Sequence, residues 1–226
     1  MNLLAIETAT TACAVAIRTS SGDERALVVE GERHHTEALA PGIRELLLAV
    51  DLPARELERV VVDRGPGLFT GLRVGVATAI GFALAAGAEL VGVTSLEVLA
   101  RGAHASGVRG TLLAAVDGRR GELFVQTFLL EDEARSVDEP IVTTPSQTVT
   151  EWSRRGGAVT FTGDGVARYA TLFRGVAGGS LYEQRVPPVL EALRLGAERD
   201  PDSAIVPLYL READAVANFA TRDVRP

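Results

Sequence analysis

Two stretches of the chain follow one pattern and decide the expected fold. Residues 3–17 read LLAIETATTACAVAI, and residues 112–128 read LLAAVDGRRGELFVQTF. In each stretch an apolar run ends at an acidic residue, Glu7 or Asp117, and a short polar turn leads into a second apolar run. This pattern is typical of a β-hairpin. The repetition therefore predicts two lobes built on one plan.

The boundary between the lobes is expected near residue 107, in a segment rich in glycine and small residues. The fold class is α/β, with a mixed sheet flanked by helices in each of the lobes 1–107 and 108–226. The tail, residues 216–226, either packs back on the first lobe or stays loose. The expected strands are 3–6, 13–17, 26–29, 60–62, 90–93 and 159–162; the expected helices are 36–50, 73–86, 95–104, 146–155 and 188–198, with Thr36, Thr70 and Ser95 as N-caps.

Composition limits the classes of function. The chain has 226 residues, 46% of them apolar, and a net charge of −7, which argues against a free-standing nucleic-acid binder. It contains no lysine, which excludes a P-loop lysine or a Schiff base, and its single cysteine, Cys13, excludes an internal disulfide. The longest apolar run, residues 74–88, is shorter than the roughly 20 residues of a membrane span. A cytoplasmic protein with no membrane contact is expected.

Candidate catalytic and metal-binding residues are few. His34 and His35 are adjacent, so on a helix their rings diverge, and no metal site is expected. No nucleophile lies in a recognisable catalytic frame, and we assign no catalytic residue. Asp117 and Asp164 each precede a glycine. Each is either a turn residue or a holder of a magnesium nucleotide between the lobes.

The stretch GPGLFTGLRVG (65–75) raises the question of what its glycines do. Without a lysine it is not a P-loop, and its glycine spacing is one residue too long for a dinucleotide fingerprint. Backbone N–H groups of a glycine-rich turn before a helix can still bind an anion. The candidate nucleotide or anion contacts are Glu7, Thr8, Gly65, Gly67 and Thr70.

Close packing is the second interpretation of this stretch, and docking of another chain is the third. Gly75, Ala79, Ala83 and Gly87 are spaced by four and form a helical ridge almost without side chains. Such a ridge lets another backbone approach closely, either the chain's own sheet or a neighbouring helix. The sequence leaves both partners open.

With these motifs in hand, the chain resembles the TsaB (YeaZ) family. GPGLFTGLRVG is similar to the family signature GPGSFTGLRIG, and further similar segments follow the family's order. They are LLAIETAT (3–10), HHTEALAPGI (34–43), VTSLEVLA (93–100), VDGRRGELF (116–124), FTGDG (161–165) and PLYLREADA (207–215).

The resemblance implies a two-lobed actin-like ATPase (ASKHA) fold and a non-catalytic role. It implies a scaffold or activator of the complex that transfers threonylcarbamoyl to N6 of adenosine 37, in tRNAs reading codons that start with A. The implied partners are the catalytic subunit TsaD and the ATPase TsaE, with a homodimer in the absence of TsaD and tRNA contacts only within the complex. No cofactor is required by this chain, and ATP, magnesium and a metal are expected on the partners.

The resemblance also favours docking as the role of the small-residue helix. The implied interface consists of His35, Leu39, Ile43, Leu46, Arg73, Val76, Ala79, Ile80 and Ala83. Arginine at position 79 or 83 is accordingly expected to leave a folded chain that no longer associates.

Four departures from the family pattern make independent nucleotide binding less expected. Leu68 replaces the usual Ser, Glu7 an Asp, Ala9 a Ser and Gly118 an Ala. Two other functions remain open: a stand-alone kinase or ATPase of the same fold, with Asp117 or Asp164 as base, and a metallopeptidase.

Overall fold

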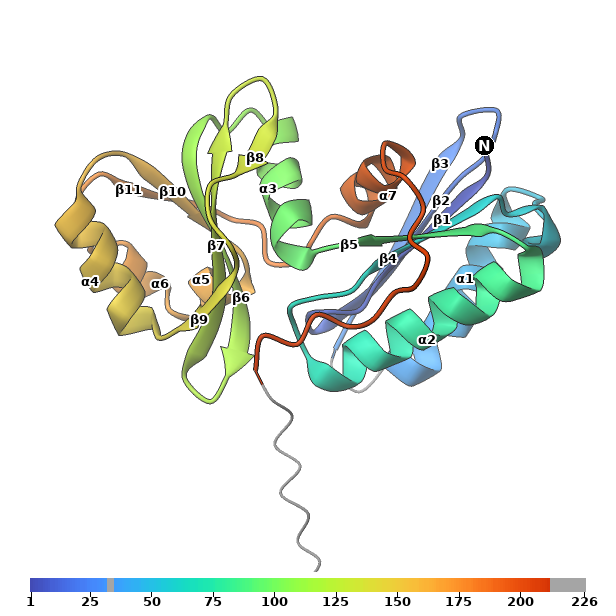
Figure 1. Ribbon diagram of the computed structural model, residues 1–226, viewed down its shortest axis with the longest axis horizontal. Coiled ribbons are helices and arrows are strands. Elements are labelled where there is room, and N and C mark those ends of the chain that lie inside the picture. The colour runs from blue at the N-terminus through green and yellow to red at the C-terminus, as the bar shows by residue number, and fades with distance from the viewer. Residues whose placement is uncertain (32–34, 212–226) are drawn as a thin grey trace, which may run out of the picture.

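The computed structural model describes residues 1–31 and 35–211, which form two β-sheets separated by helices (Figure 1). The first sheet has the order β3-β2-β1-β4-β5. Strand β2 is antiparallel to β1 and β3, whereas β4 is parallel to β1 and β5. The strands are β1 (Leu3–Glu7), β2 (Ala12–Arg18), β3 (Glu24–Glu30), β4 (Arg59–Asp63) and β5 (Glu89–Val93).

The second sheet repeats this plan. Its order is β11-β10-β6-β7-β8, and β9 also pairs with β7. The antiparallel pair β6–β7 corresponds to β1–β2, and the parallel strands β10 and β11 correspond to β4 and β5. The predicted hairpin repeat is therefore confirmed. The strands are β6 (Gly110–Arg119), β7 (Glu122–Leu130), β8 (Ala134–Ser136), β9 (Ile141–Thr143), β10 (Val159–Thr162) and β11 (Gly179–Tyr182).

Alternation along the strands of the first sheet sorts its core into two layers. Leu4, Ile6 and Val62 face a layer that contains helices α1 (His35–Ala49) and α2 (Phe69–Ala86), with the 3-10 turn η2 (Ala54–Glu56) before β4. Leu3, Ala5 and Val61 face helix α7 (Val189–Ala197). Both faces of this sheet are therefore buried.

The second sheet is covered in the same way. Leu112, Val116 and Phe128 pack against helix α3 (Ser95–Ala105). The opposite face, with Leu113 and Val125, packs against residues of three helices: α4 (Pro145–Arg155), α5 (Asp164–Arg168) and α6 (Ala170–Phe173). In Figure 1, α3 and α7 lie between the two sheets.

The helices do not follow the predicted division at residue 107. Helix α3 precedes that residue but packs on the second sheet, and α7 follows it but packs on the first. Arg59, on β4, holds α7 in place, since its Nη1 donates to the carbonyls of Gly196 at 2.9 Å and Arg199 at 2.8 Å. Its Nε donates to Glu89 at 2.9 Å. The two lobes therefore exchange helices.

All three predicted N-caps are wrong. Helix α2 begins at Phe69, four residues earlier than expected, and Thr70 lies inside it. Leu68 is its N-cap and has no capping side chain; instead the Leu68 N–H donates to the carbonyl of Ala9 at 2.7 Å. Thr94 rather than Ser95 caps α3, through a capping box with Glu97.

Two more local predictions need correction. Helix α1 begins at His35, so Thr36 lies inside the helix, and Pro41 is accommodated within it. Asp164 begins α5 instead of closing a turn. His34 and the tail, residues 216–226, lie outside the described residues.

Helix α2 is the one helix in the described part of the chain with the length and hydropathy of a membrane span. Its buried positions, which include Val76, Ala79 and Ala83, join the core of the first sheet. The sequence predicts a buried helix over residues 73–86, but α2 is buried on one face only and 33% of it is buried.

The glycines of the 65–75 stretch place α2 directly on the turn of the first hairpin. A Cβ atom at Gly67 would lie 2.2 Å from the carbonyl oxygen of Ala9, and one at Gly71 would lie 2.0 Å from that of Thr8. A Cβ at Gly75 would lie 2.1 Å from the Thr8 hydroxyl oxygen. Close packing within the chain therefore requires all three glycines.

We predict that Gly71→Ala destabilises the chain, because the added methyl group overlaps backbone that cannot move without displacing β1. The expected loss in free energy of unfolding is about 1–3 kcal/mol. Gly81→Ala, in the same helix with nothing within 4 Å of the added carbon, is the matched control. We expect it to stabilise the chain by about 0.5–1 kcal/mol. Urea unfolding measures both, and equal stabilities would contradict the packing account.

Candidate functional site

Two carboxyl groups meet at the carboxyl ends of β1 and β4, beneath the 65–75 loop. Glu7 and Asp63 are fully buried. Asp63 Oδ1 accepts hydrogen bonds from the Gly65 N–H at 2.7 Å and the Ser95 hydroxyl at 2.9 Å. Glu7 Oε1 accepts one from the Ala9 N–H at 2.8 Å. The pair thus links the first hairpin, the loop and the start of α3.

One proton is shared within this pair. Burial, and then the charge of Asp63, raise the pKa of Glu7 well above its ordinary value. Burial also raises the pKa of Asp63, although the two hydrogen bonds that its Oδ1 accepts favour the ionised form. Glu7 Oε2 and Asp63 Oδ2 are buried without a hydrogen-bond partner among the described residues. A proton on Glu7 would satisfy both oxygens, so we infer that protonated Glu7 donates to Asp63.

The predicted anion contacts do not come together in an open site. Glu7 and Thr8 are fully buried, and Gly65 is buried as well. Gly67 packs on the carbonyl of Ala9, and Thr70 is exposed on α2. The backbone of this turn at Thr8 and Ala9 is covered by the chain's own loop and the start of α2. The residues present do not fit a nucleotide at this position.

The open site between the lobes is a cleft of about 260 Å³ lined by Thr11, Asp117, Arg119, Asp164 and Arg168, among others. Asp117 Oδ2 lies 3.3 Å from Nη1 of Arg119 and 3.1 Å from Nη1 of Arg168. The Asp117 N–H donates to Asp164 at 2.9 Å. The sequence identified Asp117 and Asp164 as candidate residues, but none of its motifs indicated Arg168.

The charges in this cleft do not assemble a general base. Asp117 is held by two guanidinium groups, which occupy one of its oxygens. Burial is the largest cause that raises the pKa of Asp164, to about 6. The cleft therefore holds a charge-balanced network, in which guanidinium groups could contact an anion.

Most residues of the predicted partner interface lie in the chain's own core. Within the first lobe they pack between α1, α2 and the sheet, because helical spacing directs one apolar face of each helix inward. This placement contradicts their assignment to a docking surface. The buried residues are His35, Leu39, Ile43, Leu46, Val76, Ala79 and Ala83, whereas Ile80 is half-buried and Arg73 is exposed.

The outer face of α2 is a different set of residues, and it is small and apolar. Ala77, Gly81 and Ala85 are exposed and spaced by four, and Leu84 beside them is 78% exposed. On the adjacent helix α1, Leu48 is 70% exposed. In Figure 1, α1 and α2 run side by side over the first sheet. This outer face is the candidate docking surface.

A cluster at the start of α2 continues this surface. The guanidinium carbon of Arg73 lies 3.7 Å from the centre of the Phe69 ring, which lies 5.1 Å from that of Tyr209. Arg73 Nε also donates to the Tyr209 hydroxyl at 3.1 Å. These contacts give the local reason for a cation near this end of the helix.

His35 is a structural residue. Its Nε2 lies 3.0 Å from the carbonyl oxygen of Ala12, so it ties α1 to the first hairpin. No group of three or more His, Cys, Asp or Glu side chains suited to a metal ion occurs in residues 1–31 and 35–211.

We predict that the stability of the chain falls as pH rises above about 4, where unfolded Glu7 loses its proton, and that Glu7→Gln flattens this fall. Unfolded Glu7 loses its proton near pH 4.3, whereas folded Glu7 keeps it, so the folded state binds more protons and loses stability with rising pH. The raised pKa of Asp164 also makes the free energy of unfolding fall with rising pH, but only up to its pKa of about 6. Urea unfolding over a pH series tests this, with exposed Glu133→Gln as control. An unchanged slope in Glu7→Gln would refute the shared proton.

Comparison with known proteins agrees with this geometry. A family model described as TsaD, tRNA N6-adenosine threonylcarbamoyltransferase, matches residues 29–162, more than half of the chain. The tRNA threonylcarbamoyladenosine biosynthesis protein TsaB of Escherichia coli K12 is 36% identical over 124 residues, which cover 55% of this chain and 53% of that protein. The matched segment thus spans about half of that relative. TsaB of Bacillus subtilis is 26% identical over 230 residues, which cover 97% of this chain and 98% of that protein.

A solved structure extends the similarity to the whole fold. The crystal structure of a Pseudomonas aeruginosa protein, described as similar to peptidase YeaZ, superposes with a TM-score of 0.80 at 26% identity. The superposition covers 93% of this chain and 99% of that one. The predicted two-lobed actin-like fold is confirmed. The chain therefore belongs to the TsaB (YeaZ) family.

Proposed function

We propose that the chain is a non-catalytic subunit of the machinery that makes threonylcarbamoyladenosine in tRNA. The names of its relatives support the pathway. In this proposal the chain binds the catalytic subunit TsaD and works with the ATPase TsaE. It acts in the cytoplasm, forms a homodimer without TsaD, and contacts tRNA only within the complex.

The outer face of α2 carries the proposal. Ala77, Gly81 and Ala85 present backbone at the surface, so another helix can approach closely. Leu84 and Leu48 would bury large apolar side chains on association. A continuous apolar helical face that the described part of the chain leaves exposed is typical of a protein interface.

The turn of the first hairpin and the cleft between the lobes agree with a role without catalysis. The turn that would bind phosphate is covered by the loop, and the acids of the interlobe cleft are held in ion pairs or hydrogen bonds. ATP, magnesium and a metal would then belong to the partner subunits.

We predict that arginine on the outer face of α2 abolishes association, while arginine on its inner face unfolds the chain. Gly81→Arg and Ala77→Arg add a charge where there is room, so the fold is retained and TsaD binding weakens more than about tenfold. Ala79→Arg places a charge in the core, so we expect this variant to unfold. Ala105→Arg, at the exposed last residue of α3, is the surface control. Circular dichroism and binding to immobilised TsaD separate the outcomes, and normal TsaD binding by Gly81→Arg would contradict the assignment.

Reconstitution tests the function itself. Threonylcarbamoyladenosine formation is measured with TsaD, TsaE and the partner enzyme that supplies threonylcarbamoyl adenylate, with and without this chain. We expect product only when the chain is present, and loss of product with Gly81→Arg. Calorimetry of the isolated chain with Mg-ATP tests the stand-alone ATPase or kinase. Tight binding with turnover would favour that alternative.

A further inference from the structure

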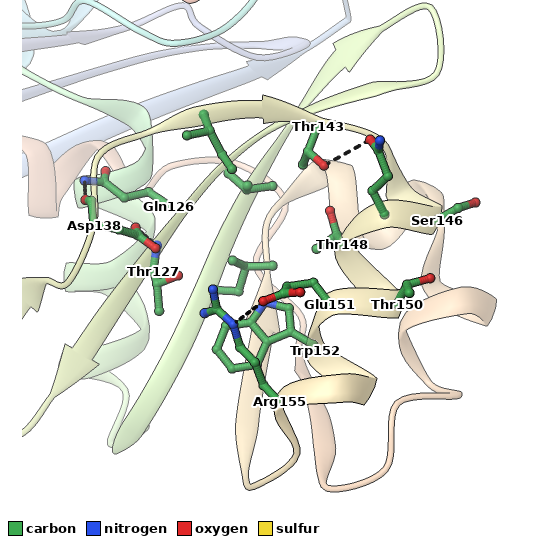
Figure 2. A pocket seen from close by; sticks show the side chains of 14 residues that line it. Gln126, Thr127, Asp138, Thr143, Ser146, Thr148, Thr150, Glu151, Trp152 and Arg155 are labelled. Carbon is green, nitrogen blue, oxygen red and sulfur yellow. Dashed lines mark hydrogen bonds and ion pairs between the residues drawn. The ribbon is translucent and has the colours of Figure 1, made fainter.

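A cavity of about 510 Å³ lies in the second lobe, between α4 and the sheet face formed by β6, β7 and β9. Figure 2 shows Trp152, Thr148 and Glu151 on the α4 side, with Thr127 and Asp138 across from them. Neither the outer face of α2 nor the interlobe cleft contributes residues to it. It is therefore a separate feature of the molecule.

The cavity exists because α4 covers its sheet less completely than α1 covers the first. The two helices have equivalent places in their lobes. Helix α1 precedes β4, which is parallel to β1, and α4 precedes β10, which is parallel to β6. Helix α1 buries four large aliphatic side chains, among them Leu39 and Ile43. Helix α4 is shorter, and Trp152 is its single large buried side chain. The uncovered sheet face forms the floor of the cavity.

The floor combines apolar surface with one hydrogen-bonding group. Leu113, Val125 and Trp152 supply the apolar part. Thr127 shares the strand face of Leu113 and Val125, and only 5% of its surface is exposed. Its hydroxyl has no hydrogen bond to any of the described residues, so it can donate to or accept from a ligand.

Three charged side chains line the cavity: Asp138, Glu151 and Arg155. Glu151 is neutralised by Arg154 and Arg155, at 2.9 Å and 2.8 Å. Arg155 also lies over the Trp152 ring, at 5.1 Å from its centre. Asp138 accepts the Thr127 N–H at 2.8 Å and has no ion pair within residues 1–31 and 35–211. Asp138 is therefore the side chain of the lining that would attract a ligand cation.

We propose that this cavity is a binding site for a small aromatic amine. The ring would lie on the apolar floor beside Trp152, and the ammonium group would face Asp138. The volume lies within the range of about 300–1,000 Å³ of ligand pockets, which combine mostly apolar walls with a few polar groups. The proposal does not depend on the role in tRNA modification.

Trp152 is the single tryptophan of the chain and lines the site, so its fluorescence reports occupancy directly. The probes are phenethylamine and phenylpropionate, which share a phenyl ring and a two-carbon linker but carry opposite charges. We expect a saturable change in Trp152 emission with phenethylamine, binding at least about tenfold weaker with phenylpropionate, and a higher melting temperature with the amine.

Three variants localise the binding. Asp138→Asn is expected to weaken phenethylamine binding by about three- to tenfold and leave phenylpropionate unaffected or slightly improved. Thr127→Leu fills the floor and is expected to remove binding of both. Glu139→Gln neutralises the exposed acid next to Asp138, outside the cavity lining, and should change nothing. Circular dichroism verifies folding, and Asp138→Asn, at an exposed position, remains informative if Thr127→Leu fails to fold.

Each other result overturns the proposal. Equal binding of the two probes would refute the preference for an amine. No saturable change with phenethylamine would refute the ligand site. If the probes have no effect while TsaD changes Trp152 emission, the cavity is a protein contact and not a small-molecule site.

Discussion

The contact between α2 and the turn of the first hairpin is the constraint on which the first lobe depends. Gly67, Gly71 and Gly75 leave no room for a side chain against Thr8 and Ala9. This approach fixes the position and the rotation of α2 on its sheet. Rotation decides which residues of α2 enter the core, so the same three glycines also decide which residues face outward. The position of the candidate docking surface thus follows from an internal contact.

The sequence was sufficient for the architecture because the architecture rests on local patterns. Two apolar hairpins with the same spacing predicted the repeated plan. The predicted ends of the strands lie within two residues of the observed ends; the strand predicted at 60–62, for example, is Arg59–Asp63 in the structure. The exchange of α3 and α7 between lobes could not be predicted, because nothing local in Ser95–Ala105 or Val189–Ala197 says which sheet is adjacent. It depends on long-range contacts such as Arg59 with Gly196.

The candidate site was harder to predict for a related physical reason. A ridge of Gly75, Ala79 and Ala83 permits close approach of any backbone, so the pattern alone does not distinguish the chain's own sheet from a partner. The outer stripe of Ala77 and Gly81 has the same composition. Only the rotation of α2 separates them, and that rotation is set by a hairpin about 65 residues earlier in the chain.

The two lobes keep one plan but have diverged in what covers the sheets. In the first lobe, long aliphatic side chains fill the space between α1, α2 and the sheet, the loop covers the hairpin turn, and α2 keeps an apolar outer face. In the second, the polar helix α4 leaves its sheet partly open, with Trp152 and Thr127 lining the space. Because the 65–75 loop covers the turn of the first hairpin, the backbone of that turn is not open to phosphate. The pair Glu7 and Asp63, with its shared proton, stabilises the loop in this position. Because two buried carboxyl groups this close do not readily ionise together, the closed turn and the protonated acid support each other, which agrees with the proposal that the first lobe acts through its surface.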